Sequence, residues 1–207
     1  MSTPRHLIIA AGLLRAEEML AVQAYPDPGS PLGRALTRRH GPSACMQVGA
    51  GVLVIDADLL QLSGAPWTCG YGQTGPDIRH GTVWSRQYAE ARLAESVAQA
   101  DADVCRIWPG ADRLHDKARA ALVSLVYNRG PSLVDSQKQP ELQTRREMRA
   151  LGPAILAADY ASIATLIEDM RRLWEGKGLD GLLRRRSNEA ALVRQAGYEA
   201  GRTGRDA

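Results

Sequence analysis

The feature that most constrains the fold is the segment from about 112 to 128. It has a helical pattern that is apolar on every face between Ala118 and Tyr127. A surface helix carries its apolar side chains on one stripe, so a helix that is apolar all round belongs in an interior. The residues at 128–131, Asn-Arg-Gly-Pro, form a helix stop, with Gly beyond the last turn and Pro after it. The segment therefore predicts the buried centre of a helical lobe.

Other segments also have helical spacing. Ser85 is placed to cap a helix over about 86–106, which carries a regular apolar stripe of Leu93, Val97, Ala100 and Val104. The chain has no Phe among its 207 residues, so Ala and aliphatic side chains must fill the core, and both suit helices. Further helices are predicted at 6–24 and at about 141–150, 157–174 and 180–199.

Two carboxylates stand at the end of the first predicted helix. The neighbours of Glu18 at helical spacing are all apolar: Ala11, Leu14, Ala21 and Val22. Burial in such a stripe favours a protonated carboxyl, which can donate a proton near neutral pH. Asp27 follows in the turn sequence Pro-Asp-Pro-Gly, where the chain stays solvated. This division of environments is expected for glycoside hydrolysis, but an ordinary acidic pair followed by an ordinary turn has the same pattern.

A second stretch, from Gly64 to Gly75, has the pattern of a Gly-rich β-strand. Large and small side chains alternate through Trp-Thr-Cys-Gly-Tyr-Gly at 67–72, which puts Thr68 on a face with almost no side-chain bulk. The succession of Glu18, Tyr25-x-Asp27 and this strand resembles the phage-type lysozymes, the endolysins of glycoside hydrolase family 24. The spacing to Tyr25 selects Glu18 over Glu17. The resemblance runs from about 18 to 193, including a closing segment around Trp174 and 181–189.

This resemblance implies a mainly helical α+β fold, lysozyme-like, in a single domain over 1–207. A small β-lobe at about 25–80 would pack beside a larger helical lobe at about 85–200, with the active site in the cleft between them. Two departures from the family are visible. Met19 stands where family members usually have Gly, and a long insertion separates Asp27 from Thr68.

The insertion covers residues 33–65. Its first half is polar and predicts a loop or a short helix. Its second half contains Val48–Ile55, the best β-branched run in the chain, which predicts an added strand. Two roles stay open: it elaborates the β-lobe, or it forms a lip that lengthens the substrate groove.

The resemblance also implies roles for individual residues. Glu18 is the expected general acid, Asp27 stabilises the positive charge of the transition state, and Thr68 holds the attacking water, which is the inverting arrangement. Substrate-binding roles are implied for Gln73 and for two residues at the end of the central helix, Tyr127 and Asn128. A buried tyrosine and a helix-capping asparagine would explain these last two equally well.

Charge and cysteine usage restrict the other possibilities. The net charge is +3, and the segment from Arg171 to Ala207 holds nine Lys/Arg against five Asp/Glu. Such a basic C-terminal helix suits contact with an anionic wall or envelope, or is only a solvated face. The three Cys and four His have no metal-ligand spacing, so free thiols, no metal and no cofactor are expected. The apolar run at 7–14 is too short to span a membrane, and no small-residue cleavage site follows it, so neither a signal peptide nor a signal anchor is expected.

We therefore expect a muramidase that cleaves the β-1,4 bond between N-acetylmuramic acid and N-acetylglucosamine and causes host lysis. Peptidoglycan is its expected partner, and we expect a monomer that stays in the host bacterial cytoplasm until it is released to the wall. Two alternatives remain. A lytic transglycosylase needs one acid but no water-holding pair, and a wall-binding or virion structural protein would leave the carboxylates idle. Nucleic-acid binding lacks a reading motif or stacking aromatics.

Overall fold

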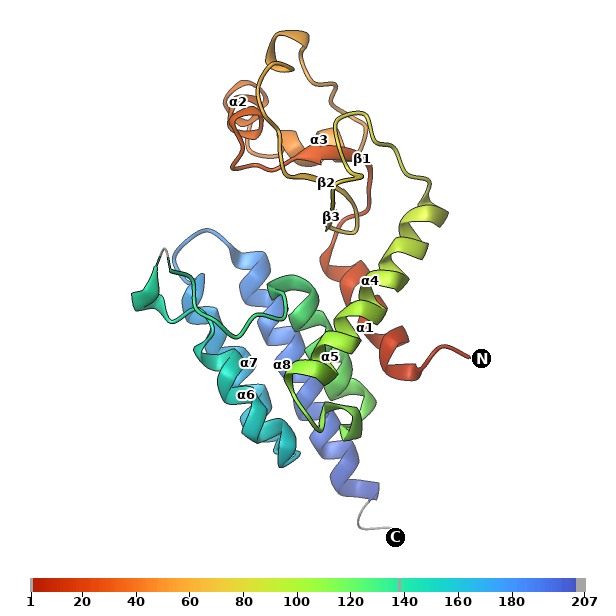
Figure 1. Ribbon diagram of the computed structural model, residues 1–207, viewed down its shortest axis with the longest axis vertical. Helices are drawn as coiled ribbons and strands as arrows, with labels where there is room; N and C mark the ends of the chain where they lie inside the picture. The colour runs from red at the N-terminus through yellow and green to blue at the C-terminus, as the bar shows by residue number, and fades with distance from the viewer. Residues whose placement is uncertain (1, 138, 204–207) are drawn as a thin grey trace. The chain divides into compact units, whose positions relative to one another are not determined.

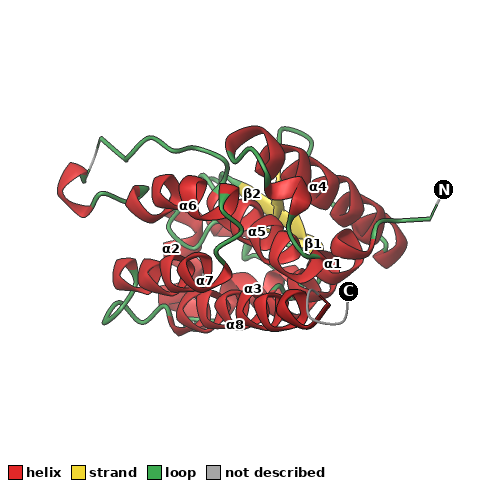
Figure 2. Ribbon diagram, turned by 90° about the horizontal axis from the view of Figure 1, so that it is seen from below, coloured by secondary structure: helices red, strands yellow, loops and turns green. Residues whose placement is uncertain are grey.

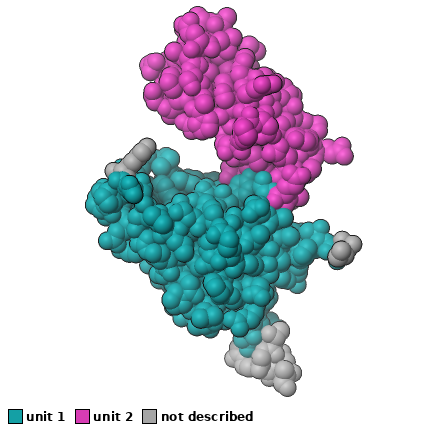
Figure 3. Space-filling model, in the orientation of Figure 1, with its two compact units in different colours: residues 1–13, 96–207 teal, residues 14–95 magenta. Residues whose placement is uncertain are grey.

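The computed structural model describes residues 2–137 and 139–203 (Figure 1). These residues are mostly helical, with one three-stranded antiparallel sheet (Figure 2). They form two compact units (Figure 3). The helical unit comprises Met1–Leu13 and Ser96–Ala207, and the sheet unit comprises Leu14–Glu95. The predicted mainly helical α+β class is confirmed, whereas a single domain of two lobes stays a prediction.

The helical unit is built around α5 (Asp116–Arg129). Every residue of α5 from Ala120 to Val126 is buried, as its all-round apolar pattern predicts. α8 (Asp180–Thr203) packs against α5 and against α7 (Tyr160–Asp169), which also contacts α6 (Arg146–Leu156). Short 3-10 helices lie at Ala111–Arg113, Pro140–Leu142 and Met170–Leu173. The helices predicted near 141, 157 and 180 are present with shifted ends.

α4 (Arg86–Ile107) confirms the predicted helix and its start. The Ser85 hydroxyl accepts a hydrogen bond from the backbone N–H of Tyr88 at 3.1 Å, which is the expected cap. All four residues of the predicted stripe are buried: Leu93, Val97, Ala100 and Val104. The division between the two units falls within α4 and within the first helix.

The prediction of one helix over 6–24 is wrong. α1 ends at Glu17 (Arg5–Glu17), and Ala21–Pro26 form strand β1. The β1 backbone pairs with β2 and, through Gln23, with Val83, so partners far along the chain supply hydrogen bonds that a helix would have made locally. Ala21 and Ala24 are buried in the strand. Because Ala21 and Val22 belong to β1, the apolar helical stripe expected around Glu18 does not exist.

The stretch 64–75 is a hairpin rather than one strand. β2 (Trp67–Gly70) pairs antiparallel with β1 and with β3 (Gln73–Thr74), giving the order β1-β2-β3. The chain reverses at Tyr71 and Gly72, where Gly72 has a φ of 83° that favours glycine. Thr68 lies opposite Tyr25 of β1 and opposite Thr74 of β3.

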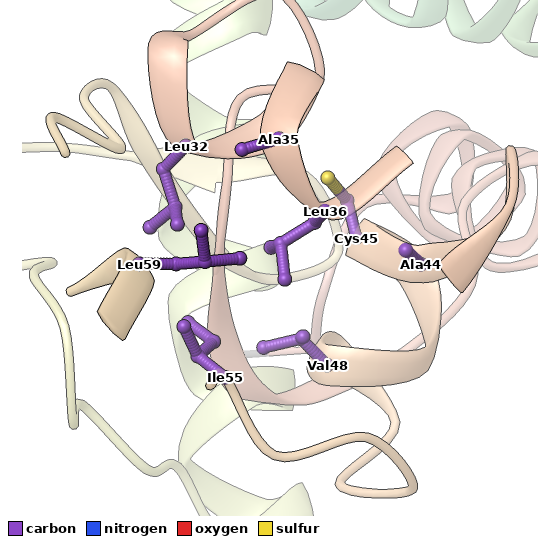
Figure 4. Packing of buried hydrophobic residues seen from close by; sticks show 8 residues of the cluster. All are labelled: Leu32, Ala35, Leu36, Ala44, Cys45, Val48, Ile55 and Leu59. Carbon is purple, nitrogen blue, oxygen red and sulfur yellow. The ribbon is translucent and has the colours of Figure 1, made fainter. Parts of the chain in front are cut away.

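The insertion is helical, and the strand predicted at 48–55 is absent. It contains most of α2 (Pro31–His40), all of α3 (Ala44–Gly49) and a 3-10 turn at Ala57–Leu59. Val52 and Val54 are exposed, so the β-branched run is mostly a surface loop that has no neighbouring strand to pair with. Ile55 instead packs into a small apolar cluster (Figure 4). This insertion cluster consists of Leu32, Ala35, Leu36, Ala44, Cys45, Val48, Ile55 and Leu59.

Candidate active site

Glu18 follows directly on the last residue of α1. Its backbone N–H still donates to the Leu14 carbonyl, at 2.8 Å, so the helix geometry extends to this residue. The side chain is partly buried and lies against the hairpin turn. A Cβ added at Gly72 would be 3.4 Å from Glu18 Oε2. The Glu18 carboxylate therefore lies close to the backbone of the hairpin turn.

Asp27 stands directly after β1, in the turn that leads to α2. Its backbone N–H donates to the carbonyls of Gly64, at 3.1 Å, and Pro66, at 3.0 Å, which ties it to the segment before β2. Its Oδ1 accepts from the Gly29 N–H at 2.8 Å, an Asx-type turn, as the Pro-Asp-Pro-Gly sequence predicts. The backbone around this carboxylate is thus fixed on both sides.

Tyr25 interacts with both Thr68 and Glu18. It faces Thr68 across the β1–β2 pair, and the Thr68 side chain interacts with its hydroxyl. Burial raises the pKa of Tyr25, the nearby Glu18 carboxylate raises it further, and the hydrogen-bonding contact with Thr68 lowers it. The phenol therefore stays protonated at neutral pH and can donate a hydrogen bond. All of these residues belong to the sheet unit.

A charged network that the sequence did not indicate surrounds the hairpin turn. Arg15 of α1 donates from Nε and Nη2 to Glu90 Oε2 of α4, at 2.9 and 2.7 Å, and the Tyr71 hydroxyl donates to Glu90 Oε1 at 2.5 Å. The hydrogen bond from Arg15, followed by that from Tyr71, lowers the pKa of Glu90. The network joins α1 and α4 to the hairpin that lies against Glu18. No spacing along the chain relates these three residues, so sequence reasoning had no signal for them.

The residues expected to bind substrate have different surroundings. Gln73 is 7% exposed, and its Oε1 accepts from the Tyr71 N–H at 2.6 Å, so this side chain supports the hairpin turn. Tyr127 and Asn128 are partly buried in the last turn of α5, in the helical unit. Gly130 caps that turn by donating to the Val126 carbonyl at 2.7 Å. Substrate roles for these three residues stay predictions.

Two further properties concern the described residues only. Across 2–137 and 139–203, no group of three His, Cys, Asp or Glu side chains is placed to hold a metal ion. Within the same ranges, no helix combines the length and apolarity needed to cross a membrane.

Comparison with solved structures gives two similar chains. One is the muramidase domain of SpmX from Asticaccaulis excentricus, with a TM-score of 0.54 and 19% identity over 89% of this chain and 93% of that one. The other is the active form of the P1 phage endolysin Lyz, with a TM-score of 0.56 and 17% identity over 89% and 82%. Both likenesses show that the fold is lysozyme-like, as the motifs predicted. None of the curated proteins matches the sequence significantly.

The sequence also matches a family model described as phage lysozyme, over residues 55–189. This range includes the Thr68 strand, the α5 helix and the closing segment up to Glu189. Glu18 and Asp27 precede it, so their assignment depends on the motif spacing and on the geometry around the hairpin. The match covers well over half of the chain and confirms the resemblance drawn from the motifs: this chain belongs to the phage lysozyme family, whose members are glycoside hydrolases acting as muramidases.

Proposed function

We propose that this chain is an endolysin that hydrolyses the β-1,4 bond between N-acetylmuramic acid and N-acetylglucosamine in peptidoglycan, and so lyses the host after release to the wall. The observation that carries the proposal is the convergence of the motif residues on one hairpin. Glu18 lies against Gly72, and Thr68 and Tyr25 are partners across β1 and β2, with Asp27 two residues beyond Tyr25. The family membership supplies the reaction class.

Each of these residues has a chemical role in the proposal. Glu18 protonates the leaving glycosidic oxygen as the sugar gains oxocarbenium character. The Asp27 carboxylate stabilises that positive charge and accepts a proton from water. The Thr68 hydroxyl holds the water, which attacks the face opposite the leaving group and inverts the anomeric centre. Tyr127 and Asn128 are proposed to contact the glycan. Gln73 is proposed to contribute to substrate binding indirectly, because its side chain supports the hairpin turn.

Contact of the C-terminal helix with anionic wall polymers is proposed as a secondary effect. Arg185 and Arg186 are buried beside Glu189, and Arg194 pairs with Glu168, so much of the basic charge is neutralised within the helical unit. Salt should therefore weaken the initial rate on whole walls only modestly.

The test replaces Glu18 by Gln, with Glu17→Gln as the matched control one residue earlier. Glu18→Gln should reduce hydrolysis of purified walls by about 10²- to 10⁴-fold, the scale expected when a general acid is lost, without lowering the melting temperature. If Glu18→Gln kept its activity and Glu17→Gln lost it, the general acid would be Glu17, and the assignment of Glu18 would be wrong.

Proton NMR of the first product then tests the stereochemistry. Inversion predicts an α-anomeric reducing end before mutarotation. A β-anomer would instead indicate a retaining nucleophile, and an anhydro end would indicate a transglycosylase.

A further inference from the structure

The insertion contacts the ring of Tyr25 through bare backbone. Gly49 is the last residue of α3, and a Cβ added there would lie 2.7 Å from Tyr25 Cδ1 and 3.1 Å from Ala21 Cβ. Both distances are shorter than ordinary carbon contacts, so only glycine lets α3 approach β1 this closely. Tyr25 also packs against the insertion cluster. Most side chains of that cluster belong to α2 and α3 (Figure 4). The insertion therefore forms the wall that holds this ring.

The other end of Tyr25 reaches the proposed catalytic residues. Its hydroxyl interacts with Thr68, the residue opposite it in the sheet, and the charge of the Glu18 carboxylate raises its pKa. Threonine is one of the side chains whose hydroxyl hydrogen rotates to suit its partners. If the Tyr25 O–H donates to Thr68 Oγ1, the Thr68 O–H is left to donate to a water oxygen. That water can then give its proton to Asp27.

The insertion holds Asp27 as well. The Asp27 carbonyl accepts from the backbone N–H and the hydroxyl of Ser30, the N-cap of α2, at 2.9 and 2.6 Å. A Cβ at Gly33, in the first turn of α2, would lie 2.1 Å from the same carbonyl oxygen. α3 therefore contacts Tyr25 in β1, and α2 contacts Asp27, two residues further along the chain.

We propose that Tyr25 is a positioning residue through which the insertion fixes the Thr68 hydroxyl for water attack. The insertion then has neither of the two roles that its sequence left open. It neither elaborates the β-lobe nor lengthens the substrate groove, because its task is to hold Tyr25 in place. This inference rests on the proposed function, since it assigns Tyr25 a task only if Thr68 holds the water.

Tyr25→Phe removes the hydroxyl and keeps the ring against Gly49. Its kcat on a soluble wall glycan should fall about tenfold, the effect of one lost hydrogen bond, while KM stays unchanged. Thr68→Ala should fall further. The double variant should be no slower than Thr68→Ala, because the Tyr25 hydroxyl acts only through Thr68. Thr68→Ser, which keeps the hydroxyl, should restore the sensitivity to Tyr25→Phe.

Gly49→Ala tests the part played by the insertion, with Gly12→Ala as control because a Cβ at Gly12 meets no atom within 4 Å. Gly49→Ala should lower kcat several-fold while Gly12→Ala has no effect. Wild-type kcat in Tyr25→Phe, or an undiminished tenfold loss in the Thr68→Ala background, would overturn the role of Tyr25. A folded Gly49→Ala variant with wild-type kcat would show that the insertion does not position Tyr25. A wild-type protein that does not cleave walls would defeat the proposed function itself, an outcome distinct from all of these.

Discussion

The centre of the helical unit and the insertion cluster are both apolar, but they are assembled differently. Around α5 the core is formed by side chains on regular helical faces, from Ala120 to Val126 and on the helices packed against them. The insertion cluster lies under two short helices whose backbone nearly touches β1 and its exit at Gly33 and Gly49. A helical core can redistribute a small change in volume among many side chains. A backbone contact at glycine has no such freedom.

Charge is also handled differently in the two regions. In the helical unit Glu147 is 2% exposed. Its carboxylate accepts a hydrogen bond from Arg172 Nε at 2.6 Å and forms an ion pair with Arg146 at 2.8 Å. Beside the insertion cluster the carboxylates stay near the surface, as in the Arg39–Asp58 pair at 2.8 Å. Because an exposed pair contributes little and a buried pair is costly to break, charge changes should matter far more in the helical unit. Five predictions test how the two regions differ, from the largest expected effect to the smallest.

The largest effect is expected for Glu147→Gln. It leaves Arg172 and Arg146 without their buried carboxylate and should lower the free energy of unfolding by about 3–5 kcal/mol. Denaturant unfolding measures this, with the exposed Glu141→Gln as control. A loss no larger than that of the control would show that the buried charges of the helical unit are not needed for its stability.

The same pair predicts a pH dependence. Burial would raise the pKa of Glu147, but the hydrogen bonds from Arg172 and from backbone, with the nearby Arg charges, outweigh it and lower the pKa overall. A folded-state pKa below the unfolded value stabilises the protein above the unfolded pKa, and this stabilisation is lost as pH falls through the folded one. The difference between wild type and Glu147→Gln should therefore shrink below about pH 4.

Leu36→Ala should come next, at about 2–5 kcal/mol, because it opens a cavity in the insertion cluster, where Leu36 is fully buried. Since this cluster supports Tyr25, the variant should also lose activity at temperatures where it remains folded. Full activity in the folded variant would show that the site tolerates a loosened insertion.

Gly33→Ala should cost about 1–3 kcal/mol through overpacking against the Asp27 carbonyl. The added methyl must displace either α2 or Asp27, so kcat should fall together with stability. The measurements are thermal unfolding and hydrolysis of walls. Gly12→Ala again provides the matched control, and equal behaviour of the two glycine variants would contradict the close approach at Gly33.

The smallest effect is expected for Val54→Ser. Val54 is 82% exposed, so the change should alter the free energy of unfolding by less than about 0.5 kcal/mol. Ile55→Val, one residue later in the cluster, should cost about 0.5–1.5 kcal/mol. A reversed order would mean that the loop at 52–54 is covered in solution.

Local chemistry explains the successful predictions of structure. The cap at Ser85, the turn at Asp27 and the stop at Gly130 depend on hydrogen bonds within a few residues. The order of Glu18, Asp27 and Thr68 was sufficient to identify the family. Their catalytic roles remain predictions, because the family match begins at residue 55 and includes only Thr68 among these three residues.

The sequence by itself determined the helical core, the turns and the family, since each depends on periodicity or on residues close together in the chain. Only the tertiary structure decided that Ala21–Pro26 is a strand and that Val48–Ile55 is not. Strand formation requires a partner: β1 finds one some forty residues away, at Trp67–Gly70, whereas Val52 and Val54 find none. The contact of Gly49 with Tyr25 and the Arg15–Glu90–Tyr71 network likewise join segments that no local pattern relates, because they form only once the chain has folded.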